Sequence, residues 1–303
     1  MIGEKMKYGI CEWSLPVSGT LAIRLAEEIG YDGMQLGEAG GRQMGYPLND
    51  PRVQALYQET AAACGIELHS LNLGALLAEG TLNYAPETMQ GRYARASLRK
   101  GFEACRALGI GTVVITVNSQ DEAQTSNVLS HLSYAVRLAS ETGVEIAMES
   151  AQELSVILGI LECMQGKIKI CMDTLNPLRF RSGNPQEQIS IFGKERISHF
   201  HLKDSKQELF RVGERGCTLL GTGDAGFAES VKLIQKMQYE GWVIPKITII
   251  YRRCMTAVCL LWNWRQKTCR QCSKASLTCS YNYMLSGTIP IGTLHFENGA
   301  VKI

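Results

Sequence analysis

Short runs of apolar residues alternate along the chain with longer segments whose apolar positions recur every three or four residues. The short runs are typical of buried strands, and the longer segments are typical of helices that bury one face. Strands are predicted at 7–13, 33–38, 66–73, 112–118, 144–150, 167–173 and 197–204, and an eighth begins at 241–244. Helices are predicted at 21–30, 50–65, 90–108, 126–142, 152–164, 185–193 and 226–239.

This alternation predicts a fold class. Strands separated by helices indicate βαβ units and a parallel sheet. Seven such units and the start of an eighth within about 250 residues favour an α/β fold of the (β/α)8 TIM barrel type, with an open doubly wound sheet as the alternative. No G-x-G-x-x-G turn follows the first strand, which argues against a dinucleotide-binding fold. The sequence therefore predicts one barrel domain over residues 1–244.

Polar residues stand at the C-terminal ends of three consecutive predicted strands. These residues are Glu149, Asp173 and His201. Because the active site of such a barrel lies at these strand ends, we expect the three side chains to converge. Two carboxylates and one imidazole suit Mn²⁺, Mg²⁺ or Co²⁺ better than a metal that prefers thiolates. Mn²⁺ is the divalent metal that we expect.

Each of these residues also has an ordinary structural interpretation. A carboxylate at a strand end often caps a helix or forms a salt bridge, and a lone histidine is more often a hydrogen-bonded core residue. Capping, salt bridges and core packing explain one such residue easily, but they explain three residues at consecutive strand ends less well. His199 alternates with His201 along one strand, so both face the same side, and His199 is the better donor behind the ligand.

Further candidate substrate-binding residues lie near the same strand ends. Trp13 follows the first strand, His69 lies on the third, and Lys203 follows His201. Packing at the top of the barrel is the alternative for Trp13. A solvated ion pair with the neighbouring Asp204 is the alternative for Lys203.

Four segments, EIAMES, KICMDTLNP, ISHFHLKDS and LGTGDAGFAESVKLI, carry a family resemblance. Over most of residues 6–244 the chain resembles the sugar phosphate isomerase/epimerase family, with its xylose isomerase-like barrel. The resemblance implies that Glu149, Asp173 and His201 are metal ligands and that Glu149 is also the catalytic base. It implies proton transfer next to the carbonyl of a sugar, sugar phosphate or cyclitol. Asn176, a candidate substrate contact, stands where ketose epimerases of the family have a histidine, which weakens a specific assignment to ketoses.

The composition changes after Ile244. Residues 1–244 carry 23 basic and 28 acidic side chains, whereas residues 245–303 carry eight basic side chains, one acidic side chain and five of the 11 cysteines. In the family, the eighth strand continues into a segment like ENYY, whose glutamate is the fourth ligand and second acid/base. This chain has PKITII at that place.

The expected segment is encoded in another reading frame. The codons CCN AAR ATH ACN ATH ATH for PKITII, read two bases later, can encode Glu-Asn-Tyr-Tyr. We therefore interpret residues 245–303 as an aberrant, out-of-frame tail, with a genuine divergent tail as the alternative. The eighth strand and its helix are then expected to be incomplete, leaving two strand edges of the barrel without partners.

Composition excludes several function classes. The acidic part before residue 245 argues against a nucleic-acid surface, and no apolar run is long enough for a membrane span or signal peptide. The six cysteines before residue 245 are scattered without paired spacing, which suits a cytoplasmic protein. We expect a metal-dependent isomerase/epimerase with a small sugar or cyclitol substrate, and the sequence leaves open whether it forms a homo-oligomer. The alternatives are an AP endonuclease-like phosphodiesterase, which would call for more histidines and a basic groove, and a non-catalytic truncated barrel.

Overall fold

The computed structural model describes residues 6–211, 216–246, 295–297 and 300–302. The chain divides into two units, Met1–Leu261 and Trp262–Ile303. The elements described in the second unit are β9 (His295–Glu297) and β10 (Ala300–Lys302), which pair antiparallel. Every residue of the predicted site lies in the first unit.

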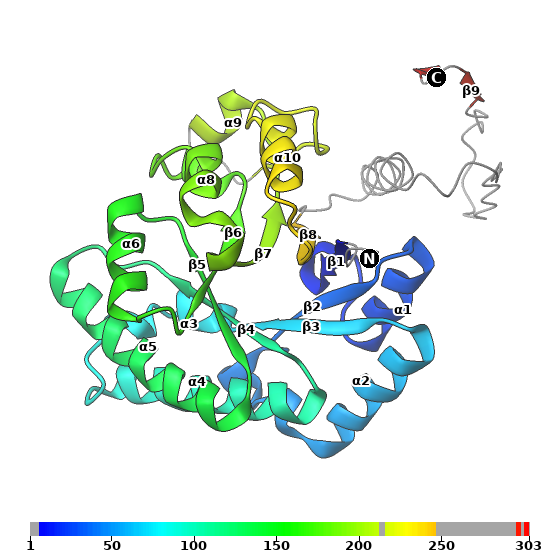
Figure 1. Cartoon of the computed structure of the whole chain (residues 1–303). Helices are drawn as coiled ribbons and strands as arrows, with labels where there is room; N and C mark the ends of the chain where they lie inside the picture. Colours follow the sequence, from blue (N-terminus) through cyan, green and yellow to red (C-terminus); the bar gives the residue numbers. More distant parts are fainter. Residues whose placement is uncertain (1–5, 212–215, 247–294, 298–299, 303) are drawn as a thin grey trace. The chain divides into compact units, whose positions relative to one another are not determined.

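In the described part of the first unit, eight parallel strands form a closed barrel in sequence order (Figure 1). They are β1 (Lys7–Cys11), β2 (Gly33–Gly37), β3 (Glu67–Asn72), β4 (Thr112–Val117), β5 (Glu145–Ser150), β6 (Lys169–Asp173), β7 (Ile197–Leu202) and β8 (Trp242–Pro245). This arrangement confirms the predicted (β/α)8 TIM barrel.

The eighth strand is the shortest of the barrel, yet it closes the ring. His201 pairs with Ile244 on one side, and Lys7 pairs with Trp242 on the other. The expectation that two strand edges lack partners is therefore wrong. Four residues are enough to close the ring, and Pro245, which lacks a donor, stands last in the strand where this matters least. The helix that would follow β8, which we expect to be incomplete, falls outside the described residues.

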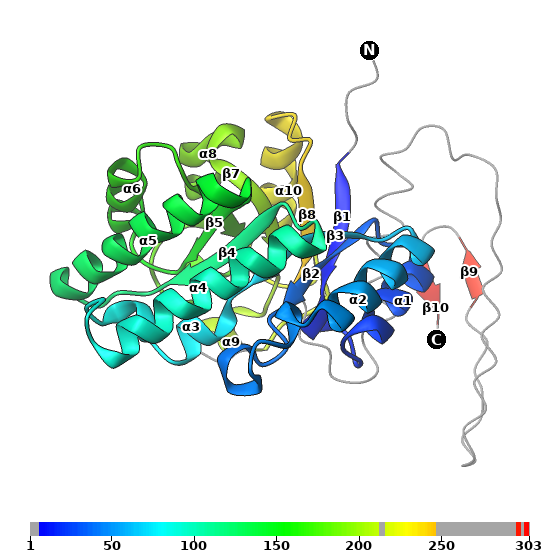
Figure 2. The same cartoon turned by 90° about the horizontal axis from the view of Figure 1, so that it is seen from below.

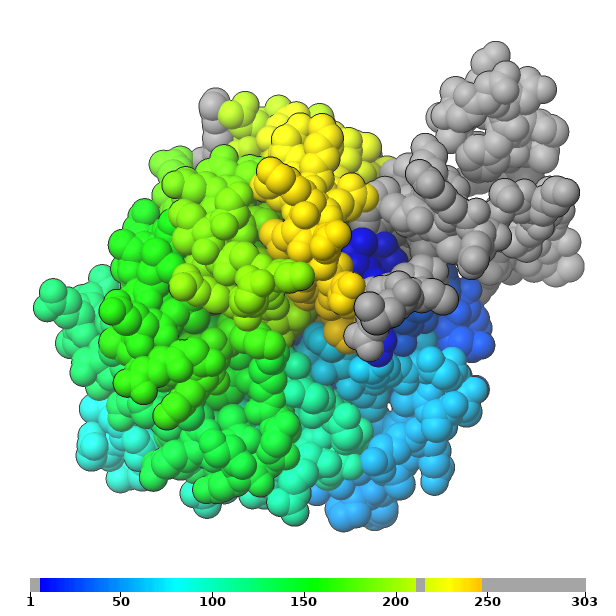
Figure 3. All heavy atoms as spheres, in the orientation of Figure 1, coloured from blue at the N-terminus to red at the C-terminus, as the bar shows by residue number. Residues whose placement is uncertain are grey.

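Helices cover the outside of the strands (Figures 1 and 2). The longer ones are α1 (Thr20–Ile29), α2 (Pro51–Cys64), α4 (Met89–Leu108), α5 (Glu122–Thr142), α6 (Leu154–Cys163), α8 (Pro185–Arg196) and α10 (Phe227–Lys236). Polar side chains begin several of them, as N-caps do. Thr88 and Asp121, for example, accept hydrogen bonds from the backbone of the first turns of α4 and α5. Neighbouring helices also bond to each other, since Gln186 of α8 donates a hydrogen bond to Ser230 of α10. In the space-filling view the yellow atoms of α10 lie against yellow-green atoms of the preceding part of the chain (Figure 3).

Shorter helices occupy connections that lead from a strand to the next long helix. They are η1 (Glu12–Ser14), η2 (Gly41–Met44), η3 (Pro47–Asn49), α3 (Gly74–Ala78), η4 (Thr81–Asn83), α7 (Asn176–Arg179) and α9 (Gln207–Arg211). These connections follow the C-terminal ends of the strands, so the extra structure gathers at the end of the barrel where the site is expected.

The two sides of the sheet differ in character. Fully buried apolar side chains such as Phe102 of α4 and Ile115 of β4 belong to the hydrophobic core. Inside the barrel, polar residues of opposite strands meet, as Gln35 of β2 and His201 of β7 do. Among the described residues, no helix has both the length and the apolar character needed to cross a bilayer.

Candidate metal and active site

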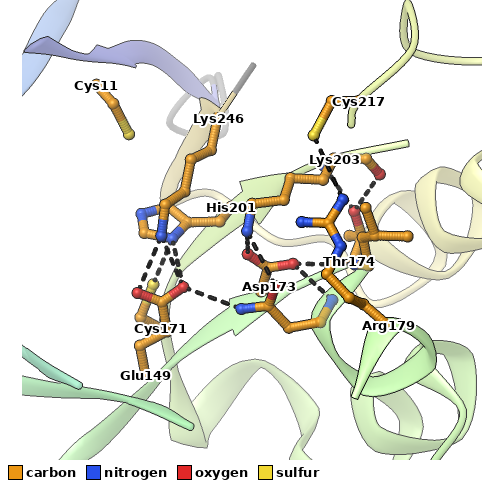
Figure 4. A network of polar contacts seen from close by, with 12 residues as sticks. Cys11, Glu149, Cys171, Asp173, Thr174, Arg179, His201, Lys203, Cys217 and Lys246 are labelled. Carbon is orange, nitrogen blue, oxygen red and sulfur yellow. Dashed lines mark hydrogen bonds and ion pairs between the residues drawn. The ribbon is translucent and has the colours of Figure 1, made fainter. Parts of the chain in front are cut away.

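The three predicted ligands come together at the C-terminal ends of β5, β6 and β7 (Figure 4). One donor atom each of Glu149, Asp173 and His201 lies within 4.8 Å of the other two. All three residues are buried, with 3%, 4% and 0% of their surface exposed. Three ionisable side chains held together in a nearly closed position require compensation by a cation or by hydrogen bonds.

The two carboxylate oxygens of Asp173 have different partners: one caps a helix, and the other faces the site. Its Oδ1 accepts hydrogen bonds from the backbone nitrogens of Leu175 (3.0 Å) and Asn176 (2.9 Å), at the start of α7. Its Oδ2 lies 2.7 Å from Lys203 Nζ as an ion pair, but it accepts no well-oriented hydrogen bond from the described residues. From the sequence, helix capping and metal binding are alternatives for Asp173. In the structure one carboxylate oxygen caps α7, which leaves the other for a metal ion, so the two roles are compatible.

Gln35 orients the imidazole of His201. Gln35 Oε1 lies 2.8 Å from His201 Nε2, while His201 Nδ1 lies 3.5 Å from Glu149 Oε1. A proton on Nε2 donated to Gln35 leaves a lone pair on Nδ1, which lies between Cys171 Sγ (3.3 Å) and Glu149, and a metal ligand requires such a free lone pair. Burial, followed by the positive charge of Lys246, lowers the pKa of His201, which favours the neutral form that binds metals.

Sequence reasoning missed Gln35, although a signal was present. It is a polar residue in the middle of the strand GMQLG, whose neighbours on both sides are buried. A polar side chain in a strand buried on both faces needs a hydrogen-bond partner, and here that partner is the candidate ligand.

Glu149 forms a buried ion pair with Lys246. The ammonium nitrogen lies 2.8 Å from Oε1 and 3.1 Å from Oε2 of Glu149. Burial alone would raise the pKa of Glu149, but the positive charge of Lys246 holds this pKa well below its usual value. Burial likewise tends to lower the pKa of Lys246, and the carboxylates of Glu149 and Asp173 outweigh it and raise this pKa. The pair is therefore a carboxylate and an ammonium.

Lys203 is buried and bonded within the site. Its Nζ lies 2.7 Å from Asp173 Oδ2 and donates to Asn176 Oδ1 at 3.0 Å. The alternative of a solvated pair with Asp204 is wrong, because Asp204 is itself buried and accepts hydrogen bonds from backbone nitrogens. Alternation along the chain explains this: Lys203 follows His201 by two residues and faces the same side.

Asn176 and Trp13 flank the two ion pairs. Asn176 Nδ2 donates to Glu149 Oε1 at 3.3 Å, so this amide links Glu149 to Lys203. Trp13 is 42% exposed, and its ring centre lies 5.8 Å from Lys246 Nζ. Trp13 is therefore a half-exposed aromatic ring next to a buried charged cluster, an arrangement typical of small-molecule sites.

His69 and His199 lie one layer deeper in the barrel. Their ring centres are 5.0 Å apart, and His69 also packs against Trp242 at 4.7 Å. Burial lowers the pKa of both, that of His69 to about 3. These neutral rings lie beneath the imidazole of His201, whose centre is 5.2 Å from that of His199.

A second group of possible donors shares His201. Cys171, His199 and His201 also place one donor atom each within 4.8 Å of one another. Burial, and then the negative charge of Glu149, raises the pKa of the Cys171 thiol well above its usual value. A thiol that stays protonated is a poor ligand, so the two carboxylates and His201 fit a divalent ion better. Two carboxylate oxygens and one imidazole nitrogen therefore form a donor set that fits a divalent cation. In this structure the ammonium of Lys246 neutralises the charge of Glu149.

A cavity of about 340 Å³ lies away from this site, between α4 and α5. Its lining residues, such as Arg106 and Leu138, belong to the C-terminal halves of these helices. Those halves lead into the N-terminal ends of the next strands, at the opposite end of the barrel. The cavity is therefore separate from the three converging ligands.

Comparisons with known proteins agree with the fold. A family model described as xylose isomerase-like TIM barrel matches residues 23–249. A 2-epi-5-epi-valiolone 7-phosphate 2-epimerase from Actinoplanes sp. is 27% identical over 234 residues, which cover 76% of this chain and 82% of that protein. A crystal structure of 3-keto-D-glucoside 4-epimerase from E. coli has a TM-score of 0.66 and 13% identity, covering 86% of this chain and all of that one (100%). The IOLI protein with a binding zinc atom has a TM-score of 0.66 and 17% identity, covering 87% and 96%. At 13% and 17% identity, these two structures support the fold alone.

Proposed function

We propose that this chain, which belongs to the xylose isomerase-like TIM barrel family, moves a proton next to the carbonyl of a sugar, sugar phosphate or cyclitol. By family resemblance it is an enzyme of the isomerase and epimerase class. The observation that carries the proposal is the meeting of Glu149, Asp173 and His201 at the ends of three neighbouring strands. The epimerase relative supports the type of reaction.

We infer that a divalent cation binds to these three residues, with Mn²⁺ as the expected ion and Mg²⁺ or Co²⁺ as alternatives. The zinc ion of the IOLI protein supports a divalent ion in a barrel of this fold. When bound, such an ion polarises the substrate carbonyl and its neighbouring hydroxyl, which makes the α-proton more acidic. Gln35 supports the site by holding His201 in the tautomer that binds metal.

Glu149 is the proposed general base. It is buried and ionised, and Thr116 and Asn176 orient its carboxylate at 3.5 Å and 3.3 Å. A base held in this way can take the α-proton from one face of the substrate. Epimerisation also requires an acid on the opposite face, whereas an isomerase returns the proton to a neighbouring atom.

Neighbouring side chains would bind the substrate. Lys203 and Asn176 offer an ammonium and an amide to hydroxyl or phosphate oxygens, and Trp13 offers the face of its ring. His69 and His199 lie one layer deeper and would act by supporting His201.

Exchange of substrate protons with solvent tests this function directly. Panels of ketoses, aldoses, their phosphates and inososes would be incubated in D₂O with Mn²⁺, Mg²⁺, Co²⁺ or EDTA, and deuterium at the α-carbon would be measured by NMR. Glu149→Gln should abolish incorporation. Glu145→Gln is the matched control, because Glu145 lies on the same strand but pairs with Lys169 and Ser198 away from the site. Incorporation that survives Glu149→Gln would rule out the assigned base.

A further inference from the structure

We propose that Lys246 is a tethered competitor of the metal, so that a divalent ion binds fully only when this side chain leaves Glu149. The inference rests on the proposed metal site and adds to it a residue that regulates occupancy. Its ammonium contacts both oxygens of Glu149, at 2.8 and 3.1 Å. A cation bound to both oxygens of a carboxylate needs that same position.

The backbone of Lys246 is held by β7, whereas its side chain reaches the edge of the site. Its nitrogen donates to the carbonyl of Leu202 on β7 at 3.0 Å, which continues the pairing of β8. The side chain is 19% exposed, compared with 8% for the side chain of Lys203. The half-exposed ring of Trp13 lies beside the ammonium. After leaving Glu149, the ammonium could therefore stack on this ring at the solvent side of the site.

Charge balance explains why the two cations compete. The two carboxylates of Glu149 and Asp173 are each paired with one ammonium group, those of Lys246 and Lys203. A divalent ion added to this set would leave a buried excess of two positive charges. Removing the ammonium of Lys246 from the site halves that excess.

Lys203 is the less suitable candidate for displacement. It is held by Asp173 and by the amide of Asn176, whereas among the described residues the Lys246 ammonium makes its hydrogen bonds and ion pair with Glu149. Lys203 also contacts the oxygen of Asp173 opposite the one that caps α7. The geometry therefore assigns the competition to Lys246.

Direct metal binding tests this inference without an activity assay. Free Mn²⁺ would be measured by EPR during titration of the full chain and of Lys246→Met, Lys246→Gln and Lys246→Arg. The two neutral variants should bind Mn²⁺ about tenfold or more tightly than the parent, which corresponds to a modest change in binding free energy. Lys246→Arg keeps the charge and should resemble the parent. Lys232→Met, on the exposed face of α10, removes the same charge away from the site and should also resemble the parent.

A second measurement in EDTA tests the ion pair itself. Lys246→Met should lower the melting temperature, because it leaves Glu149 ionised and buried without its partner. Adding Glu149→Gln to Lys246→Met should recover part of this loss, whereas the same addition to Lys232→Met should not. Lys246→Gln retains a hydrogen-bond donor toward Glu149, so it provides the binding data if Lys246→Met does not fold.

The outcomes separate the inference from the proposed function. Tighter Mn²⁺ binding in the neutral variants, lost again with Glu149→Gln, supports both. Equal and measurable affinity in the parent and the neutral variants overturns the competition and leaves the metal site standing. Absence of Mn²⁺ binding in the parent and in all variants overturns the metal site and the competition together.

Discussion

Asp204 organises the loop beside the site, and its removal should destabilise the barrel strongly. Its Oδ1 accepts hydrogen bonds from the backbone nitrogens of Ser205 (2.9 Å) and Ala225 (3.2 Å). Its Oδ2 accepts hydrogen bonds from those of Gly221 (2.9 Å) and Gly223 (2.8 Å). One carboxylate, 1% exposed, thus ties the end of β7 to the loop that precedes α10.

The expected loss of stability depends on which of these backbone donors are buried away from water. Ser205 and Ala225 are 0% and 2% exposed, so Asp204→Ala leaves two buried nitrogens without a partner. Each such group costs about 1–3 kcal/mol, which gives about 2–6 kcal/mol for the pair. The amide of Gly221 lies in an exposed residue and can bind water instead. The sum is a large share of a typical stability of about 5–15 kcal/mol.

Asp204→Asn should cost less, because its amide retains one oxygen that accepts hydrogen bonds. Asp121→Ala is the matched control, since the side chain of Asp121 is exposed and accepts a hydrogen bond from the backbone nitrogen of Gln124 at the start of α5. Its loss should cost about 1 kcal/mol. Gly223→Ala tests the same network from the other side, because a Cβ at that position would overlap Asp204 Oδ1.

Thermal and urea unfolding followed by circular dichroism would measure the global effect. Hydrogen exchange of the peptide covering 216–226 would measure the local one, because the amides of Gly221, Gly223 and Ala225 lose their acceptor. The reasoning fails if Asp204→Ala is no less stable than Asp121→Ala. It also fails if exchange in this peptide stays as slow as in the parent.

Two further predictions concern the ligands. Gln35→Leu removes the partner of His201 Nε2, and we expect a loss of about 1–3 kcal/mol in stability together with a 10–100-fold weaker affinity for Mn²⁺, measured by melting and by EPR; unchanged Mn²⁺ affinity would contradict the orienting role. Asp173→Asn should weaken Mn²⁺ binding and lower the melting temperature less than Asp173→Ala does, because an asparagine oxygen can still accept from Leu175 and Asn176 while both variants leave Lys203 without its carboxylate; equal melting temperatures in the two variants would contradict the capping role.

Most of the barrel could be predicted from the sequence because its signals are local. The strand predicted at 33–38 is β2, which ends at Gly37, and the helix predicted at 90–108 is α4, which begins at Met89. Apolar spacing and the residues that start helices act over a few positions and are readable from a single chain. The short helix α7 was not predicted, because it depends on the Asp173 carboxylate at its start.

The polar partners inside the barrel could not be predicted in the same way. Gln35 and His201 are 166 positions apart, and Glu149 and Lys246 are 97 apart. Only the closed ring of strands brings such pairs together, and no spacing rule along the chain encodes them. The three candidate ligands could be identified because each stands at the C-terminal end of a strand, and the barrel places these ends on one face.

Residue 246 connects the unusual tail with the site, and its codon suggests why a lysine stands there. One base added within the codon of Pro245 turns codon 246 into NAA, which encodes glutamate when its first base is G, and the next codons then allow Asn-Tyr-Tyr. The structure independently places residue 246 against Glu149, where a third carboxylate would serve as a metal ligand. We therefore expect Lys246→Glu to be less stable than the parent in EDTA, because buried carboxylates repel each other, and to gain more in melting temperature from Mn²⁺ than Lys246→Met does. If Mn²⁺ stabilises Lys246→Glu no more than Lys246→Met, a glutamate at this position has no role as a ligand, and the proposed out-of-frame origin of residues 245–303 loses its support from the site.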